Sequence, residues 1–130
     1  MTVAYLDSSA IVKLVVDEPE SPALRAFLAK QEDLLTSVVG AVEARRIARR
    51  RRDDADEQAA FVLGGIGLID LDARVVAAAS TLLPREIRSL DAIHLASALE
   101  LRPGLTAFVT YDDRLAEAAR AIGLPVVGPA

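Results

Sequence analysis

Short apolar runs alternate along the chain with longer amphipathic segments, and this alternation predicts an α/β fold. Short apolar runs between polar residues are typical of buried strands, whereas apolar positions three and four residues apart indicate helices. Strands are predicted at Val3–Leu6, Leu34–Thr36, Leu68–Leu71, Thr106–Val109 and Pro125–Val127. Helices are predicted at Ser9–Val16, Pro22–Lys30, Gly40–Arg51, Asp54–Leu63, Val75–Pro84, Ser89–Leu101 and Asp113–Ile122.

Strands separated by helices of about ten residues indicate a mainly parallel sheet with helices on both faces. We therefore expect a three-layer α/β/α sandwich formed by one domain over residues 1–130. Ser89 is expected to cap the helix that follows it. The apolar faces of Ile11–Val16 and Leu24–Leu28 suit either the core or an interface with a partner or a second copy.

The composition is that of a globular protein, with 52% apolar and 26% charged residues, and it excludes global disorder. The chain has no cysteine, which excludes disulfides, thiolate metal sites and a cysteine nucleophile. It has no signal-peptide pattern, and its longest nearly apolar stretch, residues 61–69, is too short to span a bilayer. We expect a cytoplasmic protein without a membrane partner.

The formal charge of −4 argues against a general nucleic-acid binder, but the basic residues are concentrated in one segment. Six arginines lie between positions 45 and 52, and four acids follow them. Arg45, Arg49 and Arg52 share one helix face and could bind RNA phosphates. The alternative is a solvated helix end whose arginines pair with the acids that follow.

Four carboxylates occupy positions that a parallel sheet would bring to one edge. Asp7 and Asp112 follow predicted strands, and Glu43 and Asp91 are predicted in the first turns of helices. Carboxyl ends of parallel strands and the following helix starts lie at the same edge. Each acid alone has a structural explanation, because a carboxylate near a helix start contributes about 0.3–1 kcal/mol.

Together, the four acids predict a cation site. Two unit charges about 4 Å apart repel by roughly 4 kcal/mol at an effective dielectric near 20. With no cysteine and one histidine, an all-oxygen site suits Mg²⁺ or Mn²⁺ and does not suit zinc. Such ions at a sheet edge catalyse phosphoryl chemistry by activating water and stabilising the leaving oxygen.

Three hydroxyl residues next to these acids have two interpretations each. Ser8 and Ser9 follow Asp7 directly, and Thr110 comes two residues before Asp112. They could hydrogen-bond to Asp7 or to a metal-bound water. They could equally cap the helices that follow, because serine and threonine are good caps.

The single histidine and two tyrosines are also open to two interpretations. His94, three residues after Asp91, could act as a general acid–base or be a packed, hydrogen-bonded core residue. Tyr5 and Tyr111 could stack on a base. Core packing is the alternative for Tyr5.

Four segments resemble the acidic motifs of PIN-domain ribonucleases and, more closely, the toxins of VapBC toxin–antitoxin pairs. The segments are Ala4–Leu14, Val42-Glu43, Ser89–Ala96 and Val109–Leu115. The resemblance covers essentially the whole chain and implies a single PIN domain. It also implies a Mg²⁺- or Mn²⁺-dependent endoribonuclease, usually a homodimer, that is inhibited by a VapB-type antitoxin whose flexible tail covers the active site.

The resemblance implies roles for the individual acids. Asp7 and Asp91 would be the foremost metal ligands, and Glu43 and Asp112 would complete the set. Metal-bound water would attack an RNA phosphodiester and leave a 5′-phosphate and a 3′-hydroxyl. In the pair Asp112-Asp113 we prefer Asp112 as the ligand, because it directly follows Thr110-Tyr111 as in the relatives, and we expect Asp113 to cap the next helix.

Two other functional classes are alternatives to the metal-dependent endoribonuclease. A phosphoacceptor receiver domain also clusters acids with Mg²⁺ on a parallel sheet, but it needs a lysine at the end of a late strand. The only lysines are Lys13 and Lys30, both early and both in predicted helices. A catalytically silent PIN fold that only binds a partner is the second alternative, although all four acids are present.

Overall fold

The computed structural model describes residues 1–130 and has a five-stranded parallel sheet at its centre. The strands are β1 (Val3–Leu6), β2 (Asp33–Ser37), β3 (Gly67–Ile69), β4 (Ala107–Val109) and β5 (Val126–Val127). Their spatial order is β3-β2-β1-β4-β5, and every neighbouring pair is parallel. The first strand of the chain is therefore the central strand of the sheet.

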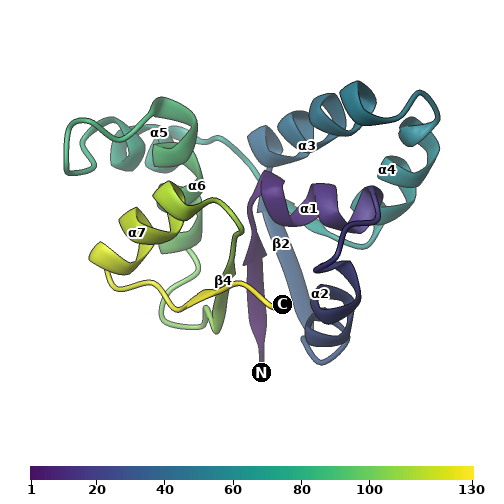
Figure 1. Ribbon diagram of the computed structural model, residues 1–130. Helices are drawn as coiled ribbons and strands as arrows, with labels where there is room; N and C mark the ends of the chain where they lie inside the picture. The colour runs from purple at the N-terminus through teal and green to yellow at the C-terminus, as the bar shows by residue number, and fades with distance from the viewer.

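Seven helices cover the two faces of this sheet. They are α1 (Ser8–Val15), α2 (Ser21–Leu28), α3 (Val38–Arg51), α4 (Ala55–Gly64), α5 (Ala73–Ser80), α6 (Ser89–Leu99) and α7 (Asp113–Ala121). Figure 1 shows α1 to α4 on one side of the strands and α5 to α7 on the other. The predicted α/β/α sandwich is confirmed, with every predicted element present in order and only the element ends shifted.

The hydrophobic core has one part on each face of the sheet. In β1, Ala4 and Leu6 pack toward α1 to α4, whereas Tyr5 packs toward α6 and α7, as the two-residue period of a strand requires. The Tyr5 ring stacks on Phe108 of β4, with 5.3 Å between ring centroids. The apolar faces of α1 and α2 are buried in the first part of the core, so they do not form a partner groove.

One shifted helix start moves a candidate site residue, and one predicted helix cap is wrong. The side chain of Ser37 accepts a hydrogen bond from the Gly40 N–H at 2.9 Å, so α3 begins at Val38. Glu43 therefore lies in the second turn of α3, not in the first. Ser89 does not cap α6: the cap position is Arg88, which has extended backbone and makes no side-chain capping bond.

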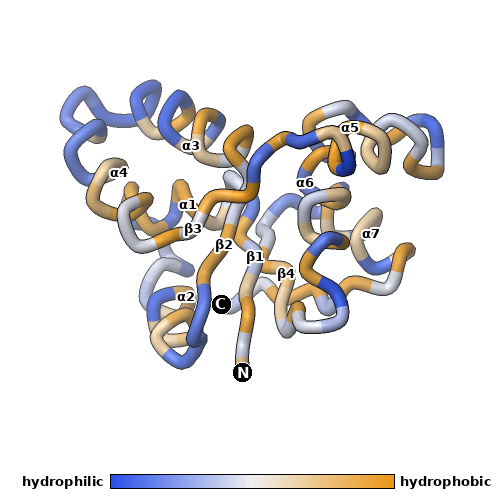
Figure 2. The backbone as a smooth tube through the Cα atoms, turned by 180° about the vertical axis from the view of Figure 1, so that it is seen from behind, coloured by the Kyte–Doolittle hydropathy of each residue, from blue (hydrophilic) through white to orange (hydrophobic).

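The most hydrophilic part of the chain is the turn between α3 and α4, where the arginine-rich helix end meets the acids that follow. Figure 2 shows this turn as a continuous hydrophilic segment at the periphery, while the strands in the interior are mostly apolar. No helix in the structure combines the length and the apolar character that are needed to cross a membrane.

Candidate active site

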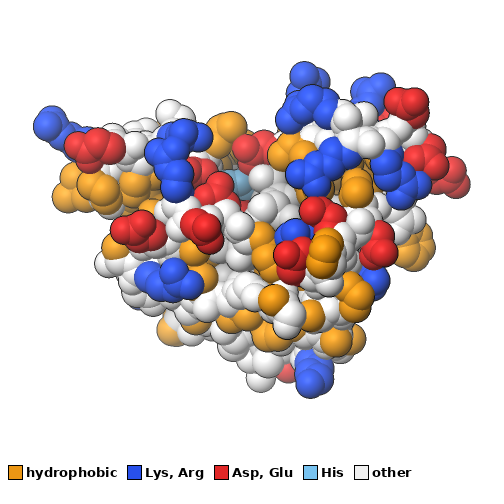
Figure 3. Space-filling model, viewed as in Figure 1, with side chains coloured by type: hydrophobic (Ala, Val, Ile, Leu, Met, Phe, Trp, Pro, Cys, Tyr) orange, Lys and Arg blue, Asp and Glu red, His pale blue; other side chains and the backbone are white.

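All four predicted carboxylates line one cavity of about 350 Å³ at the carboxyl edge of the sheet. The lining also contains Ser8, Ser9, Ile47, Arg88, Ser89, Leu90, His94 and Leu115 in addition to Asp7, Glu43, Asp91 and Asp112. Figure 3 shows acidic side chains gathered around a hollow between the two helical layers. The parallel topology thus brings together residues that are separated by more than a hundred positions in the chain.

Asp7 is held at the end of β1 by a dense set of hydrogen bonds. Its backbone N–H donates to the Val109 carbonyl at 3.1 Å, which extends the pairing of β1 with β4. Its side chain accepts from the Ala10 N–H at 3.0 Å, from the Ser9 hydroxyl at 2.7 and 2.9 Å, and from the Thr110 hydroxyl at 2.6 Å. Asp7 itself is therefore the cap of α1.

The interpretation in which Ser8 or Ser9 caps α1 is wrong, because the extended backbone of Asp7 already places its carboxylate over the first free N–H groups. Ser9 and Thr110 follow the other interpretation and hydrogen-bond to Asp7. Ser8 lines the cavity.

Burial and mutual repulsion disfavour the ionised forms of two of these acids. The Asp7 side chain is buried, and burial raises its pKa although its hydrogen bonds act in the opposite direction. The pKa of Asp91 is raised first by burial and then by the negative charge of Asp112. Arg88 is the only lysine or arginine in the lining, so the cavity carries an excess of negative charge.

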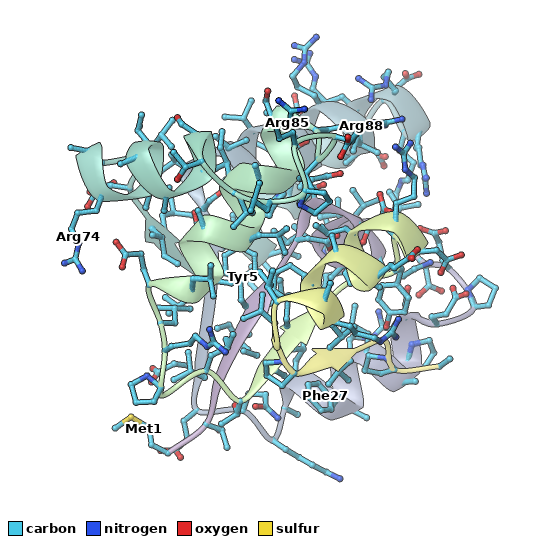
Figure 4. The ribbon with its side chains drawn as sticks, turned by 90° about the vertical axis from the view of Figure 1, so that its left-hand side faces the viewer. Met1, Tyr5, Phe27, Arg74, Arg85 and Arg88 are labelled. Atoms are coloured by element: carbon cyan, nitrogen blue, oxygen red, sulfur yellow. The ribbon has the colours of Figure 1, made fainter.

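None of Asp7, Asp91 and Asp112 forms an ion pair with a lysine or an arginine. Figure 4 shows Arg85 and Arg88 at the upper end of the molecule. The positive charge of Arg88 lowers the pKa of Asp91, which is a weaker influence than the burial that raises it.

Glu43 is held by the only histidine of the chain. Nε2 of His94 lies 2.8 Å from Oε1 of Glu43, and Nδ1 of His94 lies 2.6 Å from the hydroxyl oxygen of Tyr5. His94 is 2% exposed and Tyr5 is fully buried, so both are packed core residues. The sequence could not reveal these contacts, because His94 is 51 residues from Glu43 and 89 residues from Tyr5. The one available signal was that Tyr5 and His94 each lie within three residues of a predicted metal ligand.

At the fourth motif, the structure separates the two neighbouring aspartates. Asp112 lines the cavity, and its side chain also caps α7 by accepting from the Leu115 N–H at 3.0 Å. Asp113 is the first helical residue of α7 and is absent from the cavity lining. The expectation that Asp113 is the cap is wrong, because Asp112 has the extended backbone that a capping residue requires.

The arginines considered as RNA contacts are exposed, and two of them lie where α3 ends and the turn to α4 begins. Arg49 pairs with Asp56 at 3.3 Å, and Arg52 makes two hydrogen bonds to Asp54 at 3.0 and 3.1 Å. These contacts match the alternative in which the helix end pairs with the acids that follow. Arg45 has no ion-pair partner.

A second, more apolar cavity of about 500 Å³ adjoins the acidic one. The two cavities share Glu43, Ile47 and Leu90. The remaining lining residues are Val38, Val39, Val42, Arg46 and Arg50. Val42 is 58% exposed and Leu90 47%, so this groove next to the site is an apolar surface that the sequence did not single out.

Tyr111, the other candidate for base stacking, is also fixed in place. Its N–H donates to the Ser9 hydroxyl oxygen at 2.9 Å, and its hydroxyl donates to the Pro129 carbonyl at 2.6 Å. The ammonium of Lys13 lies 4.8 Å from its ring centroid. The ring thus has a cation as its neighbour, and its hydroxyl ties the C-terminal segment to the site.

The donor set of the acidic cavity fits a hard divalent cation. The available ligands are carboxylate and hydroxyl oxygens, which suit Mg²⁺ or Mn²⁺. No group of three Asp, Glu or His side chains is arranged to chelate a single ion. Mg²⁺ commonly binds through one or two carboxylates and retains several waters, so this arrangement agrees with its chemistry.

The fold and the site define a class of α/β/α protein with a carboxylate-lined cavity at the carboxyl edge of a parallel sheet. The family model "PIN domain" matches residues 4–121. The chain is 42% identical over 130 residues to Ribonuclease VapC47 of Mycobacterium tuberculosis, with 96% of each chain covered. It is 43% identical over 129 residues to Ribonuclease VapC46 of the same species, with 99% of each covered. The chain belongs to the PIN-domain family.

Solved structures share the fold at lower identity. Mycobacterium tuberculosis VapC20, described as a toxin that cleaves the sarcin–ricin loop, superposes with a TM-score of 0.72 at 19% identity, covering 97% of this chain and 99% of that one. A toxin–antitoxin complex from Klebsiella pneumoniae gives 0.74 at 20% identity, covering 98% of each chain.

Proposed function

We propose that the protein is a metal-dependent endoribonuclease, a hydrolase that acts as the toxin of a VapBC-type pair through a single PIN domain over residues 1–130. The observation that carries this proposal is the convergence of Asp7, Glu43, Asp91 and Asp112 on one cavity with a single arginine in its lining. Relatives that are 42% and 43% identical over nearly the whole chain and are named ribonucleases support it.

Asp7 and Asp91, completed by Glu43 and Asp112, would hold Mg²⁺, or Mn²⁺ in its place. The ion when bound supplies an activated water and stabilises negative charge on the phosphate. The chain itself orients the ligands: Ser9 and Thr110 fix the Asp7 carboxylate through hydroxyl donors. In line with the resemblance, the products are a 5′-phosphate and a 3′-hydroxyl.

Arg88 is positioned to contact the RNA backbone, because its guanidinium is the one cationic side chain that lines the acidic cavity. A guanidinium presents a fork of donors that matches phosphate oxygens. Arg45, at the surface of α3, is a further candidate for a phosphate contact because it has no ion-pair partner. Arg49 and Arg52 are weaker candidates, since both are paired with aspartates.

As partner we propose a VapB-type antitoxin, in keeping with the resemblance and with the toxin–antitoxin complex that shares this fold. The antitoxin tail would cover the site. The exposed apolar groove beside Glu43 gives such a tail an apolar surface to bind. A homodimer in the cytoplasm, where RNA and antitoxin would meet the toxin, completes the proposal.

The test is cleavage of a structured and an unstructured RNA by the purified protein with Mg²⁺, with Mn²⁺ or with a chelator. We expect metal-dependent cutting that Asp91→Asn abolishes, because this change keeps the shape of the side chain and removes its charge. Equal cutting by both proteins would indicate a contaminating nuclease. No cutting of either RNA by folded wild-type protein, together with no binding of Mn²⁺, would favour the catalytically silent alternative.

A matched pair of variants tests the fourth acid. Asp112→Asn should strongly reduce cleavage, whereas Asp113→Asn should not, because only Asp112 lines the cavity. The receiver-domain alternative lacks support, since the cavity lining contains no lysine.

A further inference from the structure

A buried chain of hydrogen bonds connects the core of the protein to the acidic cavity. It runs from the Tyr5 hydroxyl through the imidazole of His94 to Oε1 of Glu43, with separations of 2.6 and 2.8 Å. We propose that His94 is a positioning residue that holds Glu43 in the cavity, and that Tyr5 fixes the imidazole in the orientation and tautomer this requires. The inference rests on the proposed function, because it gives Glu43 a role in metal binding.

The donors and acceptors of this chain have one consistent direction. An ionised carboxylate only accepts hydrogen bonds, so Nε2 of His94 carries a hydrogen and donates it to Glu43. In the neutral imidazole Nδ1 is then an acceptor, and it accepts from the hydroxyl of Tyr5. Burial raises the pKa of Tyr5, which keeps its hydroxyl protonated as the donor. The Tyr5 hydroxyl, both imidazole nitrogens of His94 and Oε1 of Glu43 therefore each have a partner.

The packing around His94 leaves the ring little freedom to rotate. The ring of Tyr5 meets the imidazole edge-on, with 5.8 Å between centroids and an interplanar angle of 78°. Tyr5 is itself stacked on Phe108. In addition, α3 passes so closely that a Cβ atom added to Gly40 would lie 3.0 Å from Cε1 of His94. Figure 4 shows Tyr5 in the interior, between the sheet and the outer helices.

Glu43 benefits from such a support because of its position. It lies in the second turn of α3 and its side chain is 23% exposed, so an unsupported glutamate could extend toward solvent. The hydrogen bond from His94 engages only Oε1. The other carboxylate oxygen, Oε2, makes no hydrogen bond to the protein. Partners that orient metal ligands in this way typically change metal affinity by about 10–100-fold when they are removed.

The first test uses the fact that the chain has a single histidine, so its imidazole nitrogens give one set of signals in a ¹⁵N-labelled protein. In metal-free protein we expect a hydrogen on Nε2, and we expect Glu43→Gln to shift the Nε2 signal. A ring whose Nε2 carries no hydrogen, or an Nε2 signal that Glu43→Gln does not move, would overturn the proposal. A merely space-filling histidine has no reason to respond to Glu43.

The second test measures Mn²⁺ binding to the whole protein by calorimetry, without RNA. His94→Leu should weaken Mn²⁺ binding about 10-fold or more. His94→Gln should restore much of the affinity, because its amide nitrogen reaches the place of Nε2. His94→Asn should not, because its amide lies near the place of Nδ1. Ser97→Ala is the matched control: it removes an unpartnered buried hydroxyl from the same helix and should leave Mn²⁺ binding unchanged.

A double-variant cycle shows whether His94 acts through Glu43. In a Glu43→Gln background, His94→Leu should cause little further loss of Mn²⁺ affinity, since the group it positions is already changed. An equal loss in both backgrounds would overturn the proposal. If His94→Leu does not fold, Tyr5→Phe tests the same chain: it should weaken Mn²⁺ binding in the wild-type background and have little effect once Glu43 is changed.

The outcomes separate this inference from the proposed function. Wild-type protein that binds Mn²⁺ and cuts RNA, with folded His94→Leu binding Mn²⁺ equally well, would overturn the inference and leave the function standing. Wild-type protein that binds no Mn²⁺ would overturn the metal-dependent function, and with it the role of His94 in metal binding. The ¹⁵N signals would then still report whether His94 holds Glu43.

Discussion

Gly40→Ala probes the place where α3, Thr36 of β2 and the His94 ring meet. Gly40 is a buried residue in the first turn of α3, and its backbone has no positive φ. A Cβ atom at this position would lie 2.5 Å from Oγ1 of Thr36 and 3.0 Å from Cε1 of His94. Thr36 cannot move freely, because its hydroxyl donates to the Leu6 carbonyl at 2.7 Å. The added methyl group must therefore displace a packed side chain.

Three contributions set the size of the effect on the free energy of unfolding. Overpacking a core position costs about 1–3 kcal/mol. Rotating Thr36 away would also lose a hydrogen bond, at about 0.5–1.5 kcal/mol. Alanine favours a helix over glycine by about 1 kcal/mol, which offsets part of the loss. We expect a net destabilisation of about 1–3 kcal/mol.

Urea unfolding in metal-free buffer measures this change, and Gly64→Ala is the control. Gly64 is the last residue of α4 and a Cβ atom there would meet nothing within 4 Å. Gly64→Ala should therefore raise stability by up to about 1 kcal/mol through helix propensity alone. If Gly40→Ala were as stable as wild type or more stable, the close packing of α3 against His94 would be wrong. Gly40→Ala should also weaken Mn²⁺ binding, because it displaces the ring that holds Glu43.

Three further perturbations test the site and its surroundings. Because burial raises the pKa of Asp7, ionising this side chain costs folding free energy. Wild type should therefore lose stability relative to Asp7→Asn as pH rises from about 4 through the raised pKa, and the difference should level off at higher pH. Unfolding curves measured in chelator across this pH range check the prediction, and a difference that does not change with pH would contradict it. Thr110→Val removes a 2.6 Å hydrogen bond to the buried Asp7 carboxylate and should cost about 1.5–3 kcal/mol at neutral pH by urea unfolding; an unchanged midpoint would argue against this bond. Replacing Arg49 and Arg52 by alanine should leave the urea midpoint and the initial rate of RNA cleavage nearly unchanged, because both guanidiniums are engaged by exposed aspartates and exposed ion pairs contribute little to stability. A large fall in rate would support a role for them as RNA contacts.

The order of strands and helices could be predicted because each element carries its own local signal. Val3–Leu6 is apolar on both faces, as a central parallel strand must be, and both of its faces are buried in the structure. The meeting of Asp7, Glu43, Asp91 and Asp112 followed from this order, because parallel strands bring their carboxyl ends to one edge.

What sequence reasoning missed are contacts that depend on a few ångströms of geometry. Serine and aspartate cap helices almost equally well, so residue type could not decide between adjacent candidates. The structure makes Asp7 and Asp112 caps, whereas Ser89 and Asp113 are not caps. The contact between His94 and Glu43 joins positions 51 residues apart. These positions meet because α3 packs against α6 in the folded chain.

The central position of β1 determines when during synthesis the site can form. β1 is the first strand to be made, and it can pair with β2 as soon as residues 33–37 are available. Its other edge pairs with β4, which is translated after β2 and β3, and Thr110 and Asp112 follow β4 immediately. A growing chain therefore lacks its fourth carboxylate and one support of Asp7 until residues 107–112 have been translated and β4 has paired with β1. The acidic site cannot be complete before that pairing, however early β1 and β2 associate.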